Sequence, residues 1–332
     1  GLVQMAVPRQ YGGLESHALD LLRVTEEVSY GDGSAGWVLM NYQTTALCSG
    51  LLPKDWGEAI FAGPERAIPA GVLSPTGRGR RVEGGMVVDG RWGFASGCPG
   101  ANWLLATAIM DVASDEPGDK GPSVRLPMIP RSDFDIEDTW HVTGLCGSGS
   151  HHVVANETFV PEGRWITLDD PPAVETTLYR VPIVSIFPPC VVAVSLGIAR
   201  AALEDFESLA KDKVPTLSRR PLSERGSAQI DFARAEALIG AARSYVYEAT
   251  EALWDEVDCG DEASVETRRR ARLASTYAAA ACAEAVDVLS TAAGSSAIFL
   301  DNPLLRYWRD VHTAPQHMQI AATGFETMGR LR

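Results

Sequence analysis

The amino-acid sequence predicts an α+β fold in which a helical segment, a β segment and a second helical segment follow one another. Apolar residues recur at helical spacing between residues 14 and 62, and short β-branched and aromatic runs separated by turn dipeptides begin near residue 67. Long alanine-rich apolar stripes in the last third are typical of bundle helices. Because single cores stop growing near roughly 250–300 residues, we expect units at 1–66, 67–175 and 176–332.

The first segment should hold three helices. The Gly-Asp-Gly sequence at residues 31–33 interrupts the first apolar stripe, so Ser34 is expected to cap a second helix. Pro53 suits the first turn of a third helix, which should end near Gly63. The first stripe comprises Ala18, Leu21, Leu22, Thr25 and Val28.

The middle segment should form a small antiparallel barrel or sandwich. Gly84-Gly85 and Asp89-Gly90 are dipeptides of the kind that turn β-hairpins. Further strands are predicted at regular spacing, in residues 103–110, 124–129, 140–143 and 152–160.

The last segment should form a helical bundle. Apolar residues step by three or four through 191–209, 227–255 and 264–292, which predicts three long helices after a proline-rich stretch at 171–189. Asn302 can cap a shorter helix with Pro303 at its first position. Pro315 should interrupt that helix, because its ring and missing N–H do not fit a helix interior, and a last helix should end near Gly329.

Composition narrows the possible partners. The net charge is −14, from 43 acidic and 29 basic residues, so the field repels nucleic acid and anionic lipid. Six cysteines without a C-x-x-C pair indicate neither a metal site nor a disulfide framework. No apolar run approaches the ~20 residues of a membrane span, and residues 1–5 lack the charged start of a signal peptide. We expect a cytoplasmic protein without nucleic-acid, membrane or metal partners.

Four short motifs occur in an order that resembles one known family. Residues 7–13 read VPRQYGG and residues 90–97 read GRWGFASG; GLCGSGS at 144–150 precedes FVP at 159–161, and Arg309-Asp310 opens the last loop. Together they resemble the acyl-CoA dehydrogenase superfamily. That resemblance implies N-terminal helices, a central β domain, a C-terminal four-helix bundle and a homotetramer.

The active-site positions depart from those of the dehydrogenases. Such an enzyme removes a proton next to a thioester carbonyl and needs a carboxylate base within reach. By the resemblance, the family's glutamate falls on Met318, and the alternative position near residues 186–189 also lacks a carboxylate. A thioether cannot accept the proton, so the sequence argues against acyl-CoA oxidation.

Residues 309–317, RDVHTAPQH, place His317 beside that lost base. The pattern resembles the flavin-dependent monooxygenase branch of the superfamily. It implies the oxygenase component of a two-component system, which takes FMNH2 or FADH2 from a separate NAD(P)H:flavin reductase. Such an enzyme uses O2 to hydroxylate a small aromatic or other electron-rich organic substrate.

His317 is the main candidate catalytic residue. Reduced flavin and O2 form a C4a-hydroperoxide, which the protein must hold and shield from water. An imidazole, whose pKa is ordinarily near ~6.5, can exchange a proton with that peroxide or with a substrate hydroxyl. The alternative is a histidine that only packs between helices.

Other site residues come from the same resemblance. Ser96 should lie over flavin N5 as a second catalytic group, and the alternative is an ordinary serine at a strand end. Ser148 and Ser150 belong to a glycine-rich loop whose N–H groups could hold phosphate. Trp37, Ser74 and Trp92 complete the expected flavin contacts. Phe187, His312 and Met318 are assigned to the substrate pocket. Trp37 and Phe187 could equally be ordinary core residues.

Two other functions stay open at this stage. One is an FAD-dependent acyl-CoA dehydrogenase or oxidase with a relocated base, which would hold FAD tightly and reduce it with an acyl-CoA. The other is a non-catalytic flavin-binding or scaffold homologue. Failure to bind any flavin would favour that scaffold.

Overall fold

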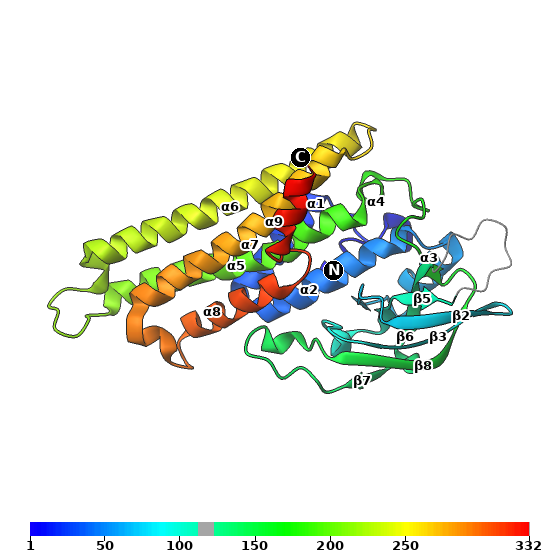
Figure 1. Ribbon diagram of the computed structural model, residues 1–332, viewed down its shortest axis with the longest axis horizontal. Helices are drawn as coiled ribbons and strands as arrows, with labels where there is room; N and C mark the ends of the chain where they lie inside the picture. The colour runs from blue at the N-terminus through cyan, green and yellow to red at the C-terminus, as the bar shows by residue number, and fades with distance from the viewer. Residues whose placement is uncertain (112–122, 332) are drawn as a thin grey trace. The chain divides into compact units, whose positions relative to one another are not determined.

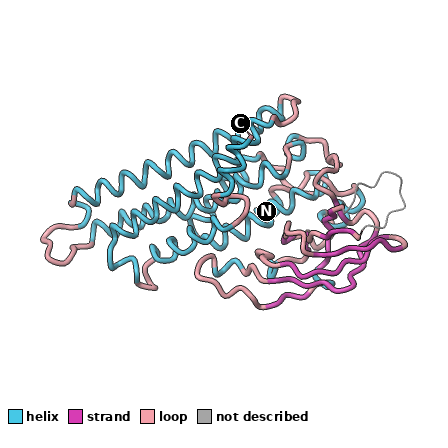
Figure 2. Tube along the Cα trace, viewed as in Figure 1, coloured by secondary structure: helices cyan, strands magenta, loops and turns pink. Residues whose placement is uncertain are grey.

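The computed structural model describes residues 1–111 and 123–331 and divides into two compact units. The β unit comprises Gly1–Ser16, Asn41–His141 and Ser148–Ile183, and the helical unit comprises His17–Met40, Val142–Gly147 and Val184–Arg332. The strands, drawn in magenta in Figure 2, belong to the β unit. The α+β class, with N-terminal helices, a central sheet and C-terminal helices, is confirmed. The three-part division at residues 66 and 175 stays a prediction.

The long helices of the helical unit, drawn in Figure 1, span the residues in which the sequence has apolar stripes. α6 (Gly226–Asp258) and α7 (Val265–Ala293) pack against each other, and α8 (Pro303–Thr313) and α9 (Thr323–Arg330) pack on α7. α1 (Ala18–Gly31) contacts α6 and also α5 (Ile183–Asp212), which touches it through Gly197. As expected, Asn302 caps α8 by accepting from Leu304 N (3.0 Å), and the helix gives way to a 3-10 turn at Ala314–Gln316 that contains Pro315.

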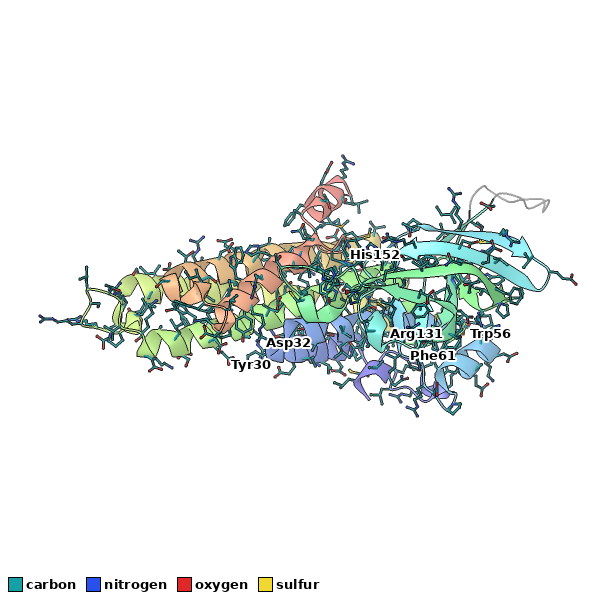
Figure 3. All side chains as sticks on the ribbon, turned by 90° about the horizontal axis from the view of Figure 1, so that it is seen from below. Tyr30, Asp32, Trp56, Phe61, Arg131 and His152 are labelled. Atoms are coloured by element: carbon teal, nitrogen blue, oxygen red, sulfur yellow. The ribbon has the colours of Figure 1, made fainter. Side chains whose placement is uncertain are left out.

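The β unit is one curled sheet in the order β1-β4-β6-β5-β2-β3-β8-β7, with β9 beside β6. Most neighbours are antiparallel, but β1 pairs with β4, and β2 with β5, in parallel. The strands are β1 (Pro69–Gly71), β2 (Gly77–Val82), β3 (Gly85–Trp92), β4 (Trp103–Leu105), β5 (Ala108–Met110), β6 (Val124–Pro130), β7 (Asp135–Glu137), β8 (His152–Pro161) and β9 (Trp165–Ile166). The helices α3 (Lys54–Phe61) and α4 (Thr177–Arg180) also belong to this unit, and Figure 3 labels Trp56 and Phe61 on α3.

Trp92 is one of the largest fully buried side chains of the β unit. Its indole is fully buried and donates from Nε1 to the Thr107 carbonyl (2.8 Å). The ring leaves no room for neighbouring side chains, since a Cβ at Gly77 or Gly90 would lie 2.3 or 2.4 Å from it. The Gly-x-Trp sequence of β3 is therefore required by packing.

Several local predictions are wrong. Asp89-Gly90 is not a hairpin turn but a bulge inside β3, where the pairing with β8 shifts register. Residues 140–143 form no strand, and β7 (Asp135–Glu137) pairs with β8 instead. α5 begins at Ile183, before Pro188 and Pro189, so the proline-rich stretch overlaps a helix.

The cap of the helix α2 (Gly33–Ala46) also differs from expectation. Asp32, labelled in Figure 3, accepts a hydrogen bond at Oδ1 from Ala35 N (2.9 Å), so the carboxylate takes the position expected for Ser34. Ser34 instead accepts a hydrogen bond from Gly147 N (3.1 Å).

α5 is the one described helix that is long and apolar enough to cross a membrane, with a mean hydropathy of 1.8 over its most apolar window. Yet 83% of that window is buried inside this structure. Burial of this kind is typical of a core helix in a soluble protein.

Candidate active site

Three of the predicted serines meet in the β unit. Ser150 Oγ lies 2.8 Å from Ser96 Oγ and 2.8 Å from Ser148 Oγ, and the three side chains are buried. Gly97 N donates to the Ser148 carbonyl (2.9 Å), which ties the turn after β3 to the glycine-rich loop. A hydroxyl can donate or accept, so this serine cluster can adapt to the nitrogen and oxygen atoms of a flavin.

The turn that carries Ser96 also presents an aromatic pair that sequence reasoning missed. Phe94 adopts φ 63°, is 70% exposed, and meets Trp140 edge to face with ring centroids 6.1 Å apart. A bulky residue in the left-handed region is uncommon and often marks a functional turn. Phe94 lies inside the GRWGFASG motif at residues 90–97, but the sequence alone does not predict its backbone conformation.

Ser74 and Trp92 are the two other residues of the β unit that are predicted to contact the flavin. Ser74 is exposed in the connection between β1 and β2, where its carbonyl accepts from Thr76 N (2.9 Å). The Trp92 indole faces the interior, so any effect on the flavin would come through the strand that it anchors.

His317 lies in the helical unit, directly after the 3-10 turn that follows α8. Its Nδ1 accepts from Gln319 N (3.2 Å), and its ring packs edge to face with Trp37 at a centroid distance of 5.6 Å. Burial, and next the positive charge of Arg272, lower the pKa of His317 from 6.5 to about 4. The imidazole is therefore neutral at physiological pH, and with Nδ1 accepting, its proton lies on Nε2.

Arg272 of α7 holds the segment around His317, a role that sequence reasoning missed. Its guanidinium donates to the Met318 carbonyl (2.5 Å) and to the Gln319 side-chain oxygen. The Met318 side chain is 66% exposed. The backbone of Met318, which occupies the position expected for the dehydrogenase base, thus serves to fix the histidine loop.

The other predicted pocket residues have separate surroundings. Nε2 of His312 lies 2.9 Å from Asp287 Oδ1, an oxygen that also accepts from Trp308 Nε1 (2.7 Å), so this imidazole is tied to α7. Phe187 is almost fully buried in α5. Among the described residues, no ring contact or hydrogen bond joins Phe187 to His317.

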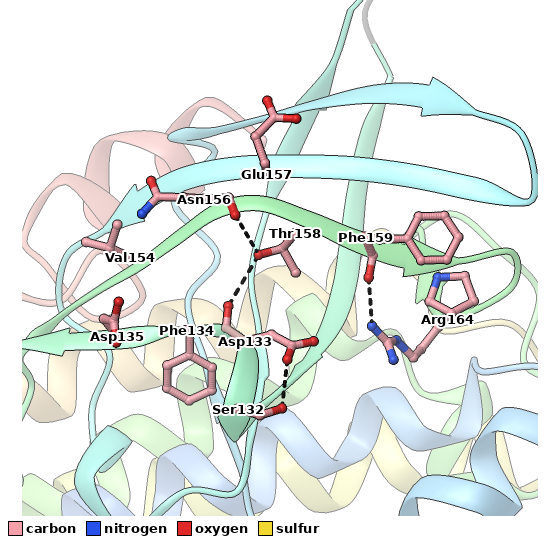
Figure 4. A pocket seen from close by; sticks show the side chains of 11 residues that line it. Ser132, Asp133, Phe134, Asp135, Val154, Asn156, Glu157, Thr158, Phe159 and Arg164 are labelled. Atoms are coloured by element: carbon pink, nitrogen blue, oxygen red, sulfur yellow. Dashed lines mark hydrogen bonds between the residues drawn. The ribbon is translucent and has the colours of Figure 1, made fainter.

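A surface pocket of about 640 Å³ lies on the β unit (Figure 4). Side chains of β7, β8 and the turn before β7 line it, and Arg164 donates to the Phe159 carbonyl (3.2 Å) at one end. It contains none of the predicted site residues.

Residues 189–322 match the family model described as acyl-CoA dehydrogenase, C-terminal domain. The chain is 31% identical to indole-3-acetate monooxygenase of Pseudomonas putida, over all of this chain and 84% of the relative. It is 26% identical to the FADH(2)-dependent resorcinol hydroxylase, oxygenase component, of a Rhizobium species, over 99% of this chain and 83% of the relative. XiaF from a Streptomyces species, solved with FADH2 and glycerol, superimposes with a TM-score of 0.91 at 26% identity, covering 99% of this chain and 85% of XiaF.

With this fold and these relatives, the chain belongs to the flavin-dependent monooxygenase branch of the acyl-CoA dehydrogenase superfamily. It is the oxygenase component of such an enzyme and uses reduced flavin and O2 on a small-molecule substrate. A separate flavin reductase supplies the reduced flavin to this class. The relatives favour this function over the relocated-base dehydrogenase and over the non-catalytic homologue.

Proposed function

We propose that this enzyme hydroxylates a small aromatic substrate and that His317 and the serine cluster serve that reaction. The observation that carries the proposal is the neutral, half-buried imidazole of His317 next to Met318, where a dehydrogenase would need a carboxylate. The names of two relatives, which act on indole-3-acetate and resorcinol, support an electron-rich aromatic ring as substrate.

The serine cluster fits a flavin because its three hydroxyls are already buried and hydrogen-bonded to one another. Such groups can bind the ring or phosphate of FMN or FAD without first giving up contacts to bulk water. Reduced flavin, when bound, would supply the two electrons that let one atom of O2 enter the substrate while the other leaves as water. Ser96 is assigned to the ring, and Ser148 and Ser150 to the phosphate or ring edge.

His317 is assigned to the oxygen that leaves as water. Its Nε2–H can donate a hydrogen bond to that oxygen, while Gln319 N fixes the ring through Nδ1. Trp37 holds one edge of the imidazole and limits its rotation. Because the ring stays neutral, it offers this hydrogen bond without bringing a full charge into a dry site.

Five further assignments extend the family resemblance. We propose a cytoplasmic homotetramer, an NAD(P)H-dependent reductase as the source of reduced flavin, and Trp37, Ser74 and Trp92 as residues that support the flavin site. Phe187, His312 and Met318 are proposed to border the substrate. We also propose that the domains of this chain meet near residues 66 and 175.

The test is oxygen transfer with isotopic label. The purified protein is mixed anaerobically with reduced FMN or reduced FAD, then with ¹⁸O2 and either indole-3-acetate or resorcinol. One ¹⁸O atom in a hydroxylated product, detected by mass spectrometry, is the expected result. If neither reduced flavin binds, or if all the oxygen appears as H2O2 with every aromatic substrate tried, the proposal is wrong.

A further inference from the structure

The loop Val142–Gly147 lies in the helical unit and is held there by backbone contacts. Gly144 packs directly on α8: a Cβ at this position would lie 2.2 Å from the Arg309 carbonyl oxygen and 2.4 Å from Thr313 Oγ1. No side chain larger than hydrogen fits there without moving the loop or the helix. The glycine therefore allows the loop to approach α8 closely.

The next residue is fixed by a buried carboxylate. Leu145 N donates to Asp310 Oδ1 at 2.6 Å, and the Asp310 side chain is only 5% exposed. Leu145 adopts φ 51°, a conformation that a leucine takes only when its surroundings compensate for the strain. A short hydrogen bond to a carboxylate is strong enough to provide that compensation.

The loop has a second attachment on α2. Gly147 N donates to Ser34 Oγ (3.1 Å), and Ser34 is free for this bond because Asp32 caps the helix. Trp37, one turn further along α2, packs against His317. Residues three apart share a helix face, so one face of α2 holds both the loop and the ring neighbour of the proposed catalytic histidine.

We propose that Asp310 and Ser34 are positioning residues for the reaction, which fix the loop that leads into Ser148 and thereby keep the serine cluster ready to bind reduced flavin. The inference rests on the proposed function of that cluster. Gly147 is bonded to Ser148 along the chain, so freedom at residues 145–147 becomes freedom at the serines. Binding would then have to order the loop, and the cost of ordering lowers affinity.

The variants separate the hydrogen bond from simple loss of folding. Asp310→Ala removes the acceptor for Leu145 N, whereas Asp310→Asn keeps an amide oxygen at the same place. Ser34→Ala removes the attachment of Gly147. The matched control is Ser195→Ala, since Ser195 is a buried serine of α5 whose hydroxyl has no hydrogen-bond partner among the described residues. The Kd for reduced FMN and reduced FAD is measured by anaerobic titration, and the ratio of product to H2O2 is measured at saturating flavin.

Asp310→Ala and Ser34→Ala are each expected to raise the Kd for reduced flavin about tenfold, which corresponds to one lost hydrogen bond of about 1.4 kcal/mol. Asp310→Asn should restore the Kd to within about threefold of wild type, and Ser195→Ala should leave it unchanged. If Asp310→Ala does not fold, Ser34→Ala decides the question. Folded Asp310→Ala or Ser34→Ala protein with the wild-type Kd and product ratio would overturn the inference while leaving the proposed function intact. A wild-type protein that binds no reduced flavin would overturn both.

Discussion

At the residue scale, the chemistry depends on an imidazole that does not take up a proton. We expect His317→Ala to lower hydroxylated product per O2 consumed by about 10²–10⁴-fold, the usual contribution of a positioned proton-handling group. H2O2 should rise correspondingly, because oxygen is still reduced but no longer transferred. The control is His141→Ala, a histidine of the β unit that is 75% exposed. The same amount of hydroxylated product per O2 consumed in both variants would contradict the catalytic role of His317.

The lowered pKa of His317 also predicts a pH dependence of stability. The unfolded chain binds a proton at His317 as pH falls through 6.5, but the folded protein does not until about pH 4. Stability is therefore highest above pH 6.5 and falls towards pH 4, by on the order of 3 kcal/mol from this group. The His317→Gln variant cannot lose stability in this way. The difference in unfolding free energy between wild type and this variant, measured with urea, should therefore shrink from pH 7 to pH 4. Parallel pH curves would show that His317 is not responsible.

The sequence predicted candidate site residues that have chemically distinctive side chains. Ser96, Ser148 and Ser150 could be picked out because they lie in glycine-containing motifs, and His317 because it stands beside a lost carboxylate. Arg272 could not be picked out, since its importance comes from contact with residues 46 and 47 positions later in the chain. Phe94 was missed because its left-handed backbone is a property of the folded turn.

At the scale of elements, the contact between α1 and α5 depends on a glycine. A Cβ at Gly197 would lie 2.2 Å from the Glu26 carbonyl oxygen and 2.7 Å from Ser29 Cβ. Gly197→Ala should therefore cost about 1–3 kcal/mol by forcing the two helices apart. Gly240→Ala, in α6, should instead stabilise by about 0.5–1 kcal/mol through helix propensity, because beyond the adjacent helix backbone no described atom lies within 4 Å of the new Cβ. Chemical denaturation gives the change in unfolding free energy for each variant. Equal changes for Gly197→Ala and Gly240→Ala would contradict the packing argument.

The same helices share a buried carboxylate. Glu26 of α1 is 1% exposed and accepts from Arg200 (2.8 Å), Arg243 (2.9 Å) and the Tyr247 hydroxyl (2.6 Å). Arg243→Ala would leave this charge short of a partner and should cost about 2 kcal/mol, less than a fully buried pair because Arg243 itself is 44% exposed. Arg80→Ala breaks a pair that is open to water on both sides and should cost under about 1 kcal/mol. The urea midpoints of unfolding measure the stability lost in each variant. A smaller loss of stability for Arg243→Ala than for Arg80→Ala would be inconsistent with a buried ion pair.

Element boundaries were predicted well where one local rule acts and poorly where two compete. Asn302 begins α8 as expected, although Asp301 precedes it, because Pro303 suits the first helical position. At α2, both Asp32 and Ser34 could cap, and the carboxylate took the position. Asp89-Gly90 suits a turn, yet pairing with β8 continues past it and absorbs the extra residue as a bulge. Such competition is decided by partners distant in sequence.

At the scale of the whole molecule, the order of helical and β segments was predictable because apolar residues repeat with different periods in helices and in strands. The sheet order was not, since β1 and β4 or β2 and β5 pair in parallel across intervening chain. Parallel pairing of short strands leaves no turn signal to read. The family motifs therefore predicted the fold class more surely than the strand pattern predicted the sheet.

The last prediction concerns assembly. Ile298, Phe299 and Leu300 in the helical unit are 71%, 60% and 83% exposed, and adjacent exposed apolar side chains can form a surface that another molecule covers. A homotetramer would cover it with a second copy, so light scattering should give a mass near four times 35.6 kDa. Phe299→Ser combined with Leu300→Lys should lower that mass, because a charge cannot be buried in the contact without a partner. Leu217→Ser, also at a fully exposed leucine, should not lower it. A wild-type protein with the mass of one chain would rule out the tetramer.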